Sequence, residues 1–271
     1  YHIPAVDYSE GVKTAYLQGA QAKEFILPKE LLEQDCVISL SKMKTHALER
    51  ITGAVKNSYG FIYGFHKAKG HTHYPSADSF ARMLIDLNKC VAPKLYVMDG
   101  IVAMEGNGPG SGDPVPMNVL LMSTDPVALD SVFSRLVYLK PEMVPTNYHG
   151  EKMGLGTWKE EKITLLTPDG EISMAEAVKK YGNPAFNVDR TEVRKNIWTR
   201  MAGALNIFQK KPYIEADKCV RCGICVQSCP VPGKAVDFRK GKGKPPVYDY
   251  RKCIRCFCCQ EMCPKKAIKV K

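Results

Sequence analysis

The sequence contains the run Cys219-x-x-Cys222-x-x-Cys225-x-x-x-Cys229-Pro230 and, after a basic spacer, the run Cys253-x-x-Cys256-x-x-Cys259-x-x-x-Cys263-Pro264. The two runs have the same spacing, and a proline follows the last cysteine of each. This doubled spacing is typical of bacterial ferredoxins that hold two iron–sulfur cubanes, in which the fourth cysteine of each run serves the other cluster. The pattern therefore predicts the fold of the last part of the chain.

The spacing assigns the eight cysteines to two sets that cross between the runs. One [4Fe–4S] cluster is predicted to take the following cysteines: Cys219, Cys222, Cys225 and Cys263. The second [4Fe–4S] cluster is predicted to take the remaining four: Cys253, Cys256, Cys259 and Cys229. Disulfides and zinc sites also use Cys-x-x-Cys pairs, but neither explains the third and fourth cysteines with their proline. Cys258 is out of register and is predicted to be a non-ligand thiol.

The basic charge of the chain is concentrated in the same region. Residues 211–271 carry 15 Lys and Arg against 5 Asp and Glu, a net charge of +10 out of +11 for the whole chain. Each oxidised cubane with its four thiolates adds roughly −2, which leaves a modestly basic module. Such a surface favours docking to an acidic redox partner protein, and no nucleic-acid-binding motif accompanies it. We therefore expect no nucleic acid partner.

Cysteine use and hydropathy indicate the compartment. Nine of the 11 cysteines lie in the doubled pattern and its surroundings, which favours a cytoplasmic protein of low-oxygen or anaerobic life over a secreted disulfide scaffold. No run of about 18 apolar residues is present, so no membrane span is expected. The chain begins at Tyr1 without a methionine, and we expect the start of the natural protein to be missing.

The rest of the chain predicts an α/β body over residues 1–182, a helical linker over 183–210 and the small α+β ferredoxin domain over 211–271. Short apolar strands over 35–40, 94–98, 117–122 and 162–167 alternate with helical patterns, which is typical of an open, mostly parallel sheet. Helices are predicted over 48–62, 79–90, 126–138 and 174–181, with a histidine-rich loop after the first of them. Ser76 or Asp78, Asp125 and Ser173 are the expected helix caps.

Cationic and amide side chains follow the first strand, and they are the candidate catalytic or ligand-binding residues: Lys42, Lys44, His46, Lys56 and Asn57. Ligands of open α/β sheets bind beyond the carboxyl ends of the strands. We therefore expect this set to share one edge with the Glu105–Asp113 glycine loop and with Thr124-Asp125. The set suits a carboxylate or phosphate group, and His46 is expected to move a proton near neutral pH. The alternative is that these are solvated surface charges.

Several segments of the body occur in an order that resembles a known family: Lys42–His46, Thr52–Asn57, Asp99-Gly100, Glu105–Pro109 and Asp125–Asp130. Together with the ending Cys253–Pro264, they resemble the iron–sulfur-binding family catalogued as domain of unknown function 362, over roughly residues 35 to 264. The resemblance implies a further α/β segment before the start of this chain. It supplies no settled reaction.

Three functions agree with this sequence. The first is an electron-transfer protein whose α/β body binds an anionic ligand. The second is an oxidoreductase that reduces a small carboxylate- or phosphate-bearing substrate at the body, with electrons fed through the clusters. The third is a factor that assembles the metal centre of another enzyme.

Overall fold

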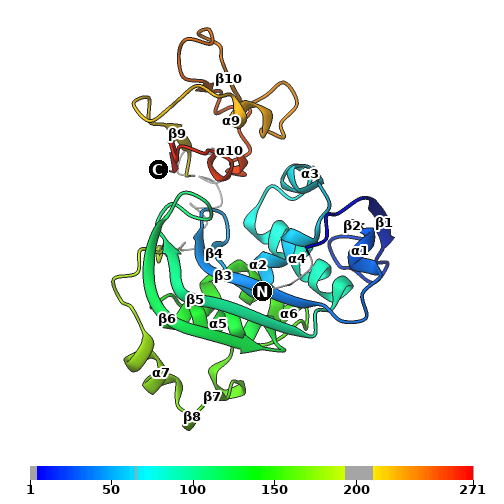
Figure 1. Cartoon of the computed structure of the whole chain (residues 1–271), viewed down its shortest axis with the longest axis vertical. Coiled ribbons are helices and arrows are strands. Elements are labelled where there is room, and N and C mark those ends of the chain that lie inside the picture. Colours follow the sequence, from blue (N-terminus) through cyan, green and yellow to red (C-terminus); the bar gives the residue numbers. More distant parts are fainter. Residues whose placement is uncertain (1–4, 65, 193–209, 271) are drawn as a thin grey trace, which may run out of the picture.

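The computed structural model describes residues 5–64, 66–192 and 210–270. Figure 1 shows an α/β body, built around one curved sheet, and a smaller unit formed by the end of the chain. The smaller unit lies beyond the end of the sheet, next to the β3–β4 turn and the loop between β5 and β6. The α/β fold class is confirmed.

The sheet of the body has the strand order β4-β3-β5-β6. Its strands are β3 (Ile38–His46), β4 (Arg50–Thr52), β5 (Leu95–Glu105) and β6 (Asp113–Ser123). Only β3 and β5 pair in parallel in this sheet, because β3–β4 and β5–β6 are hairpins. The prediction of a mostly parallel sheet is therefore wrong, and the sheet is mixed.

The antiparallel direction of β6 also separates two of the expected neighbours. β3 and β5 both end towards the smaller unit, whereas β6 starts there and ends at the opposite edge. Thr124 and Asp125 follow β6, so they do not share an edge with His46, and that expectation is wrong. Asp125 instead caps the next helix, as predicted, because its Oδ1 accepts from the N–H groups of Val127 and Ala128.

Residues 42–46 continue the first strand instead of following it. Along β3 the side chains of Ser39, Ser41, Met43 and Thr45 are buried, and Lys42 points to the exposed face. The strand extends past the predicted end at Leu40 because the side chain of Met43 packs into the core of the body. Lys42 and Lys44 are thus held by a strand and not by a loop.

The three longer capped helices begin as predicted. Serine capping boxes start α4 (Ala77–Val91) at Ser76 and α7 (Met174–Tyr181) at Ser173, and Asp125 starts α5 (Pro126–Leu136). The predicted helix over 48–62 is wrong: that stretch forms β4, α2 (Ala54–Asn57) and η1 (Ser58–Phe61). The predicted histidine-rich loop is also wrong, because it contains α3 (His66–His73).

The other elements of the body are short: β1 (Gly11–Ala15), β2 (Glu24–Pro28), α1 (Lys29–Leu32), η2 (Pro141–Met143), α6 (Pro145–Lys152), η3 (Glu160–Lys162), β7 (Leu165–Thr167) and β8 (Gly170–Ile172). One core packs α5 against the inner face of the sheet, through Met98 and Phe133, for example. A second core lies between α4 and the β1–β2 hairpin. The outer face of the sheet exposes Leu40, Leu120 and Met122.

Asp130 ties the start of α2, the short helix that carries Lys56 and Asn57, to α5. Its carboxylate is fully buried and accepts from the N–H groups of Ala54 and Val55 at 2.5 and 3.1 Å. Burial raises the pKa of this carboxyl from 3.8 to about 7. Since the folded state binds the proton more tightly, the stability that Asp130 contributes is complete below pH 3.8 and decreases as the pH rises to 7.

We expect Asp130→Ala to lower the free energy of unfolding by about 2 kcal/mol or more, because two buried N–H groups lose their acceptor. The deficit relative to the wild type should shrink as the pH rises from 4 to 7. Urea unfolding followed by tryptophan fluorescence across this pH range measures both effects. A deficit that grows with pH would contradict the assignment of a raised pKa.

The smaller unit consists of two similar halves. Its elements are β9 (Pro212–Ile214), α9 (Ile224–Gln227), β10 (Val236–Asp237), β11 (Val247–Tyr248), α10 (Cys258–Glu261) and β12 (Ile268–Val270). β9 pairs with β12 and β10 pairs with β11, so each two-stranded sheet joins the two halves of the sequence. Of the predicted helical linker, residues 183–192 are described and contain no helix, and residues 193–209 lie outside the described residues.

Candidate cluster sites and their junction with the body

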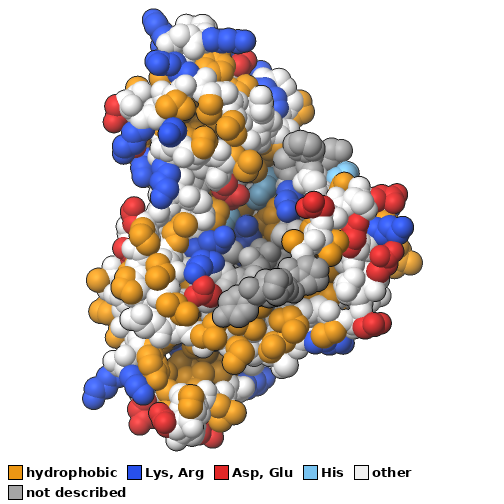
Figure 2. Space-filling view, in the orientation of Figure 1, with side chains coloured by type: hydrophobic (Ala, Val, Ile, Leu, Met, Phe, Trp, Pro, Cys, Tyr) orange, Lys and Arg blue, Asp and Glu red, His pale blue; other side chains and the backbone are white. Residues whose placement is uncertain are grey.

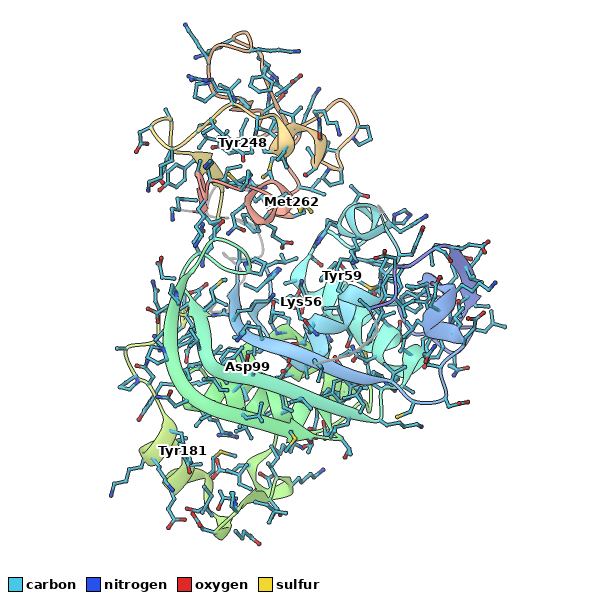
Figure 3. The ribbon with its side chains drawn as sticks, viewed as in Figure 1. Lys56, Tyr59, Asp99, Tyr181, Tyr248 and Met262 are labelled. Atoms are coloured by element: carbon cyan, nitrogen blue, oxygen red, sulfur yellow. The ribbon has the colours of Figure 1, made fainter. Side chains whose placement is uncertain are left out.

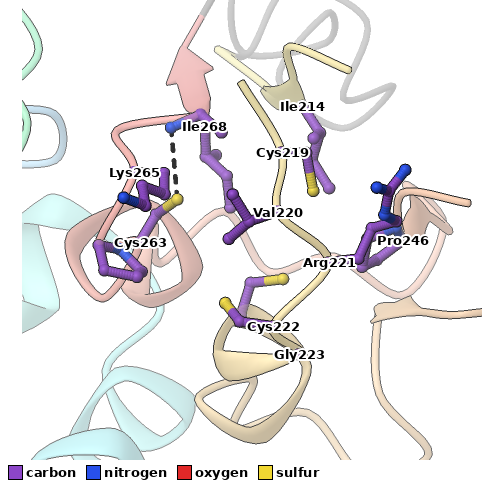
Figure 4. Close-up of a pocket in the computed structure, with 13 residues that line it drawn as sticks. Ile214, Cys219, Val220, Arg221, Cys222, Gly223, Pro246, Cys263, Lys265 and Ile268 are labelled. Carbon is purple, nitrogen blue, oxygen red and sulfur yellow. Dashed lines mark hydrogen bonds between the residues drawn. The ribbon is translucent and has the colours of Figure 1, made fainter. Parts of the chain in front are cut away.

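Two cavities in the smaller unit separate the eight cysteines into two groups. Cys219, Cys222, Cys225 and Cys263 line one cavity of about 360 Å³, which Figure 4 shows. The other four cysteines line a second cavity of about 300 Å³: Cys229, Cys253, Cys256 and Cys259. These are the two groups that the crossed spacing predicts.

The backbone repeats its unusual conformations at matching positions of the two halves. Left-handed φ values occur at Arg221 and Arg255, two residues after the first cysteine of each run, with φ of 58° and 56°. They occur again at Gly223 and Phe257, at 79° and 60°. The same turn therefore wraps each cavity, and the second copy uses phenylalanine where the first uses glycine.

The lining of both cavities fits an iron–sulfur cubane. Besides its cysteines, each cavity is lined mostly by apolar residues, such as Ile268 in the first and Val236 in the second. The cysteines are its only Cys, His, Asp or Glu side chains, which matches the all-thiolate ligand set of such clusters. Within the described residues, no group of three or more such side chains is placed to hold a single metal ion.

Cys258 does not line either cavity. It is the first residue of α10 and is buried, and its thiol is hydrogen-bonded to Cys256. Burial and this bond raise the pKa of the Cys258 thiol. Its position supports the prediction of a non-ligand thiol beside a ligand cysteine.

The glycine loop of the body holds the smaller unit in place. The buried side chain of Gln260 donates from Nε2 to the carbonyls of Asn107 and Gly108 at 2.8 and 3.0 Å. Asn107 donates in turn to the carbonyl of Ile268 at 3.0 Å, and Lys266 donates to that of Gly112 at 3.1 Å. A Cβ on Gly108 would lie 2.2 Å from the carbonyl oxygen of Thr45, so the loop needs glycine there. This loop is a structural contact surface.

His46 joins the body to α10. Its Nε2–H donates to Oε1 of Glu261 at 3.0 Å, and its Nδ1 accepts from the N–H groups of Leu48 and Glu49 at 3.1 Å. Nδ1 therefore carries no proton. Burial, with the charge of Lys56, lowers the pKa of His46 to about 4. The expectation that His46 moves a proton near neutral pH is wrong, because the ring is neutral and both nitrogens are engaged.

Glu261, the partner of His46, is charged. Burial acts to raise its pKa, but the hydrogen bond from His46 and the charge of Lys56 lower it to about 2. Glu261 lies between Cys259 and Cys263 in the sequence, two residues from each. The contact with His46 therefore brings the end of β3 close to a segment that carries one cysteine of each group, Cys259 of the second and Cys263 of the first.

Lys44 and Lys56 face this junction from β3 and α2, within electrostatic range of each other and of Glu261. Lys56 is 8% exposed, and its ammonium lies 5.6 Å from the ring centroid of Tyr59. Neither lysine forms an ion pair with any residue that the structure describes. Burial lowers the pKa of Lys44, and Lys56 lowers it further. Figure 3 shows Lys56 and Tyr59 on the side of the body that faces Met262 of the smaller unit.

The other two predicted residues have partners elsewhere. Lys42 forms an ion pair with Asp99 on the outer face of the sheet, and both side chains are partly exposed. Asn57 donates from Nδ2 to the carbonyl of Leu40 at 3.0 Å, which ties α2 to β3. The structure thus brings Lys44, His46 and Lys56 together, and it places Lys42 and Asn57 beside them with other contacts.

Two buried groups near Lys56 were not predicted as site residues. Glu49, in the β3–β4 turn, is fully buried, and neither of its carboxylate oxygens has a hydrogen-bond partner among the described residues. Burial raises the pKa of Glu49 well above its usual range, and the charge of Lys56 acts in the opposite sense. His71 of α3 is stacked on Phe80, and its Nδ1 has no partner in the described part of the chain. Only the tertiary structure shows that these side chains are buried, so no sequence signal distinguishes them.

Figure 2 shows a recess between the smaller unit and the body, with basic and histidine side chains visible in it. A separate open groove of about 940 Å³ lies on the Arg50 side of the junction, where Asp189 and Tyr213 also contribute. No helix among the described residues combines the length and the apolar character that crossing a membrane requires.

Comparison with known proteins finds two family matches along the chain. Residues 1–135 match the family described as Domain of unknown function (DUF362), and residues 211–264 match the 4Fe-4S dicluster domain. A thylakoid-associated protein of Synechocystis sp. (strain ATCC 27184 / PCC 6803 / Kazusa) is 42% identical over 147 residues. That match covers 54% of this chain and 46% of the relative, so the aligned part spans about half of the relative's length. No solved structure matches the chain.

The dicluster match covers the segment that contains the two cysteine-lined cavities, and it identifies this segment as an electron-transfer domain that binds two [4Fe–4S] clusters. The chain therefore belongs to the iron–sulfur proteins that join a domain of the DUF362 family to a 4Fe–4S dicluster domain.

Proposed function

We propose that this protein transfers electrons through its two clusters and that its body binds, at the junction, a ligand that carries a carboxylate or phosphate group. The observation that carries this proposal is the position of Lys44 and Lys56, two ammonium groups without an ion pair among the described residues, beside the loop of Glu261. Unpaired cations in a partly buried site favour an anion, since an anion offsets the cost of burying them.

The proposed cluster ligands are the cysteines of each cavity: Cys219, Cys222, Cys225 and Cys263 for one cluster, and Cys229, Cys253, Cys256 and Cys259 for the other. The second cluster is the one proposed to serve the junction. Cys256, a proposed ligand of this cluster, lies within electrostatic range of the hydroxyl of Tyr59. The ring of Tyr59 in turn contacts the ammonium of Lys56. The thiol of Cys222 in the first set is exposed to solvent, which suits the entry of electrons.

A redox partner of acidic character suits the outer surface of the dicluster domain. Its exposed basic side chains include Arg221, Lys240, Lys242, Lys244, Arg251 and Lys252. Arg221 also lines the cavity of the first cysteine set, so a partner bound there would lie next to that cluster. Attraction between unlike charges would speed the encounter and weaken with salt.

A reductase is the second candidate, and Glu49 favours it. Glu49 is a buried carboxyl near Lys56, and its raised pKa lets it keep its proton to a higher pH than an ordinary glutamate, which suits a proton donor. Each cubane supplies one electron, so a chain reduced at both clusters delivers two electrons, and two protons balance the reduction of a carbonyl or a carbon–carbon double bond.

We expect Lys44→Ala to weaken binding of an anionic probe at least tenfold, because one of the two ammonium groups is lost. The probes are inorganic phosphate and acetate, measured by isothermal titration calorimetry on protein with both clusters. Lys42→Ala is the matched control: its ammonium is already paired with Asp99, so the affinity should stay at the wild-type value. Equal affinity in all three proteins would mean that the lysines only balance the charge of the nearby cluster.

The reductase candidate has its own measurement. Dithionite-reduced protein is mixed with carboxylate- and phosphate-bearing compounds that contain a reducible carbonyl or double bond, and reoxidation is followed by the absorbance of the clusters. A true substrate should reoxidise the wild type and Lys42→Ala at the same rate and Lys44→Ala at least tenfold more slowly. If the Lys44→Ala protein reoxidises at the wild-type rate, the reductase proposal is wrong.

A further inference from the structure

The two halves of the dicluster domain differ at one matching position. The residue five places before the first cysteine of each run is Ile214 in the first half and Tyr248 in the second. Ile214 pairs with Ile268 across the β9–β12 sheet, and Tyr248 pairs with Val236 across the β10–β11 sheet. Each of the two residues lines the cavity of its own run, as Figure 4 shows for Ile214. They are therefore structural equivalents.

This difference changes the hydrogen bonds to the thiols. The Tyr248 hydroxyl donates to Sγ of Cys259 at 3.2 Å, whereas Ile214 has no donor to offer the first group. One backbone N–H bonds to a thiol in each set: Ala267 N–H donates to Cys263 and Ala235 N–H donates to Cys229, both at 3.3 Å. Two side-chain bonds to the second set have no counterpart in the first half: the bond from Tyr248 to Cys259 and the bond between Cys258 and Cys256, whose matching position is Ile224. Of these two donors, Tyr248 is the one that lines the cavity.

We propose that Tyr248 raises the reduction potential of the cluster in the Cys253 set and so biases electrons towards the cluster beside the junction. Reduction adds a negative charge that is shared by the cluster and its thiolates, and a hydrogen bond to a thiolate stabilises that charge. The hydroxyl lies in the partly buried interior of the domain, where a hydrogen bond to an anion is stronger than in water. Tyr248 is a positioning and tuning residue, and it does not carry the electron.

The proposed difference in potential would favour electron transfer from the more exposed cysteine set to the more buried one. The first cysteine set is the more open one, with Cys222 exposed, whereas Cys256 and Cys259 of the second set are buried. Burial acts in the opposite sense, because a low-dielectric site disfavours added negative charge. The hydrogen bond from Tyr248 offsets this cost at the cluster that faces the body. The inference rests on the proposed cysteine sets and on the junction as the place of electron exit.

The test is a potentiometric titration followed by EPR, on the wild type and two single variants, without any added ligand. Tyr248→Phe removes the hydroxyl and keeps the ring, which is stacked on Tyr250 with 5.6 Å between centroids. We expect the higher-potential wave to move to a more negative potential by about a tenfold change in the reduction equilibrium, or ~59 mV for one electron. The other wave should stay in place.

Ile214→Tyr is the converse variant, since it offers a hydroxyl to the first cysteine set. It should move the lower-potential wave to a more positive potential and bring the two waves together. Iron analysis and the EPR intensity at full reduction show whether both variants keep two clusters. Tyr248→Phe protein with both clusters and unshifted potentials would overturn the proposal, as would a shift confined to the lower-potential wave.

These measurements separate the inference from the proposed function. A shifted potential in Tyr248→Phe supports the tuning role even if no anionic probe binds at Lys44. Unshifted potentials with normal binding of the probes would remove the tuning role and leave the ligand site of the junction in place.

Discussion

Cys222→Ala is expected to remove one of the two clusters and leave the other intact. The chain should then hold about four irons in place of about eight. A cubane bound by only three thiolates at this exposed site is expected to dissociate from the domain. Iron and sulfide analysis of anaerobically purified protein gives the count, and the EPR spectrum of the reduced protein should lose the signature of two interacting clusters.

The crossed assignment can be tested with the fourth cysteine of each run. Cys263→Ala should remove the same cluster as Cys222→Ala, so the double variant should retain as much iron as either single variant. Cys229→Ala should remove the other cluster, so its combination with Cys222→Ala should leave almost no iron. If Cys229 instead pairs with Cys222, the two double variants exchange their results.

Cys258→Ala is the matched control for these variants. Cys258 is buried, like the ligand cysteines around it, but it lines neither cavity. The variant should keep about eight irons. A loss of four irons in Cys258→Ala would make this thiol a ligand and would require a different assignment for the second run.

Glu49→Leu is expected to make the protein more stable and to remove the function of the junction. A fully buried carboxyl without a hydrogen-bond partner among the described residues costs stability, and a leucine of similar size replaces it without that cost. We expect the free energy of unfolding to rise by about 2 kcal/mol at neutral pH. Reduction of any substrate that reoxidises the wild type should fall at least a hundredfold, because the proton donor is absent.

The pH dependence of this gain follows from the raised pKa of Glu49. The folded protein binds the proton more tightly than the unfolded chain, so Glu49 destabilises the wild type increasingly as the pH rises above its ordinary pKa of 4.5. The stability gained in Glu49→Leu should therefore be larger at pH 8 than at pH 4. Urea unfolding at both pH values measures it.

Glu171→Leu serves as the control for Glu49→Leu, because Glu171 is an exposed residue of the β7–β8 hairpin. It should change neither the stability by more than about 0.5 kcal/mol nor the reoxidation rate. A Glu49→Leu protein that is less stable than the wild type would show that the carboxyl has a partner that stabilises it. In that case its role in the junction would be structural.

The sequence by itself determined the features that depend on neighbours along the chain. The cysteine spacing sets which thiols can reach one cubane, because a short turn fixes the first three relative to one another. The capping residues Ser76, Asp125 and Ser173 determined where three helices begin, because each cap bonds to an N–H two or three residues ahead.

The tertiary structure decided what depends on distant partners. Alternating strand and helix patterns do not state strand direction, so the antiparallel β6, and with it the removal of Asp125 from the site, could not be predicted. The sequence placed Lys44, His46 and Lys56 together, but burial decided their chemistry. The pKa of His46 is low because the surrounding body excludes water from the ring and Lys56 opposes its charge, and these two effects outweigh the opposite effect of Glu261, 215 residues away. A pKa is set by the dielectric and the charges around a group in space, and local sequence contains neither.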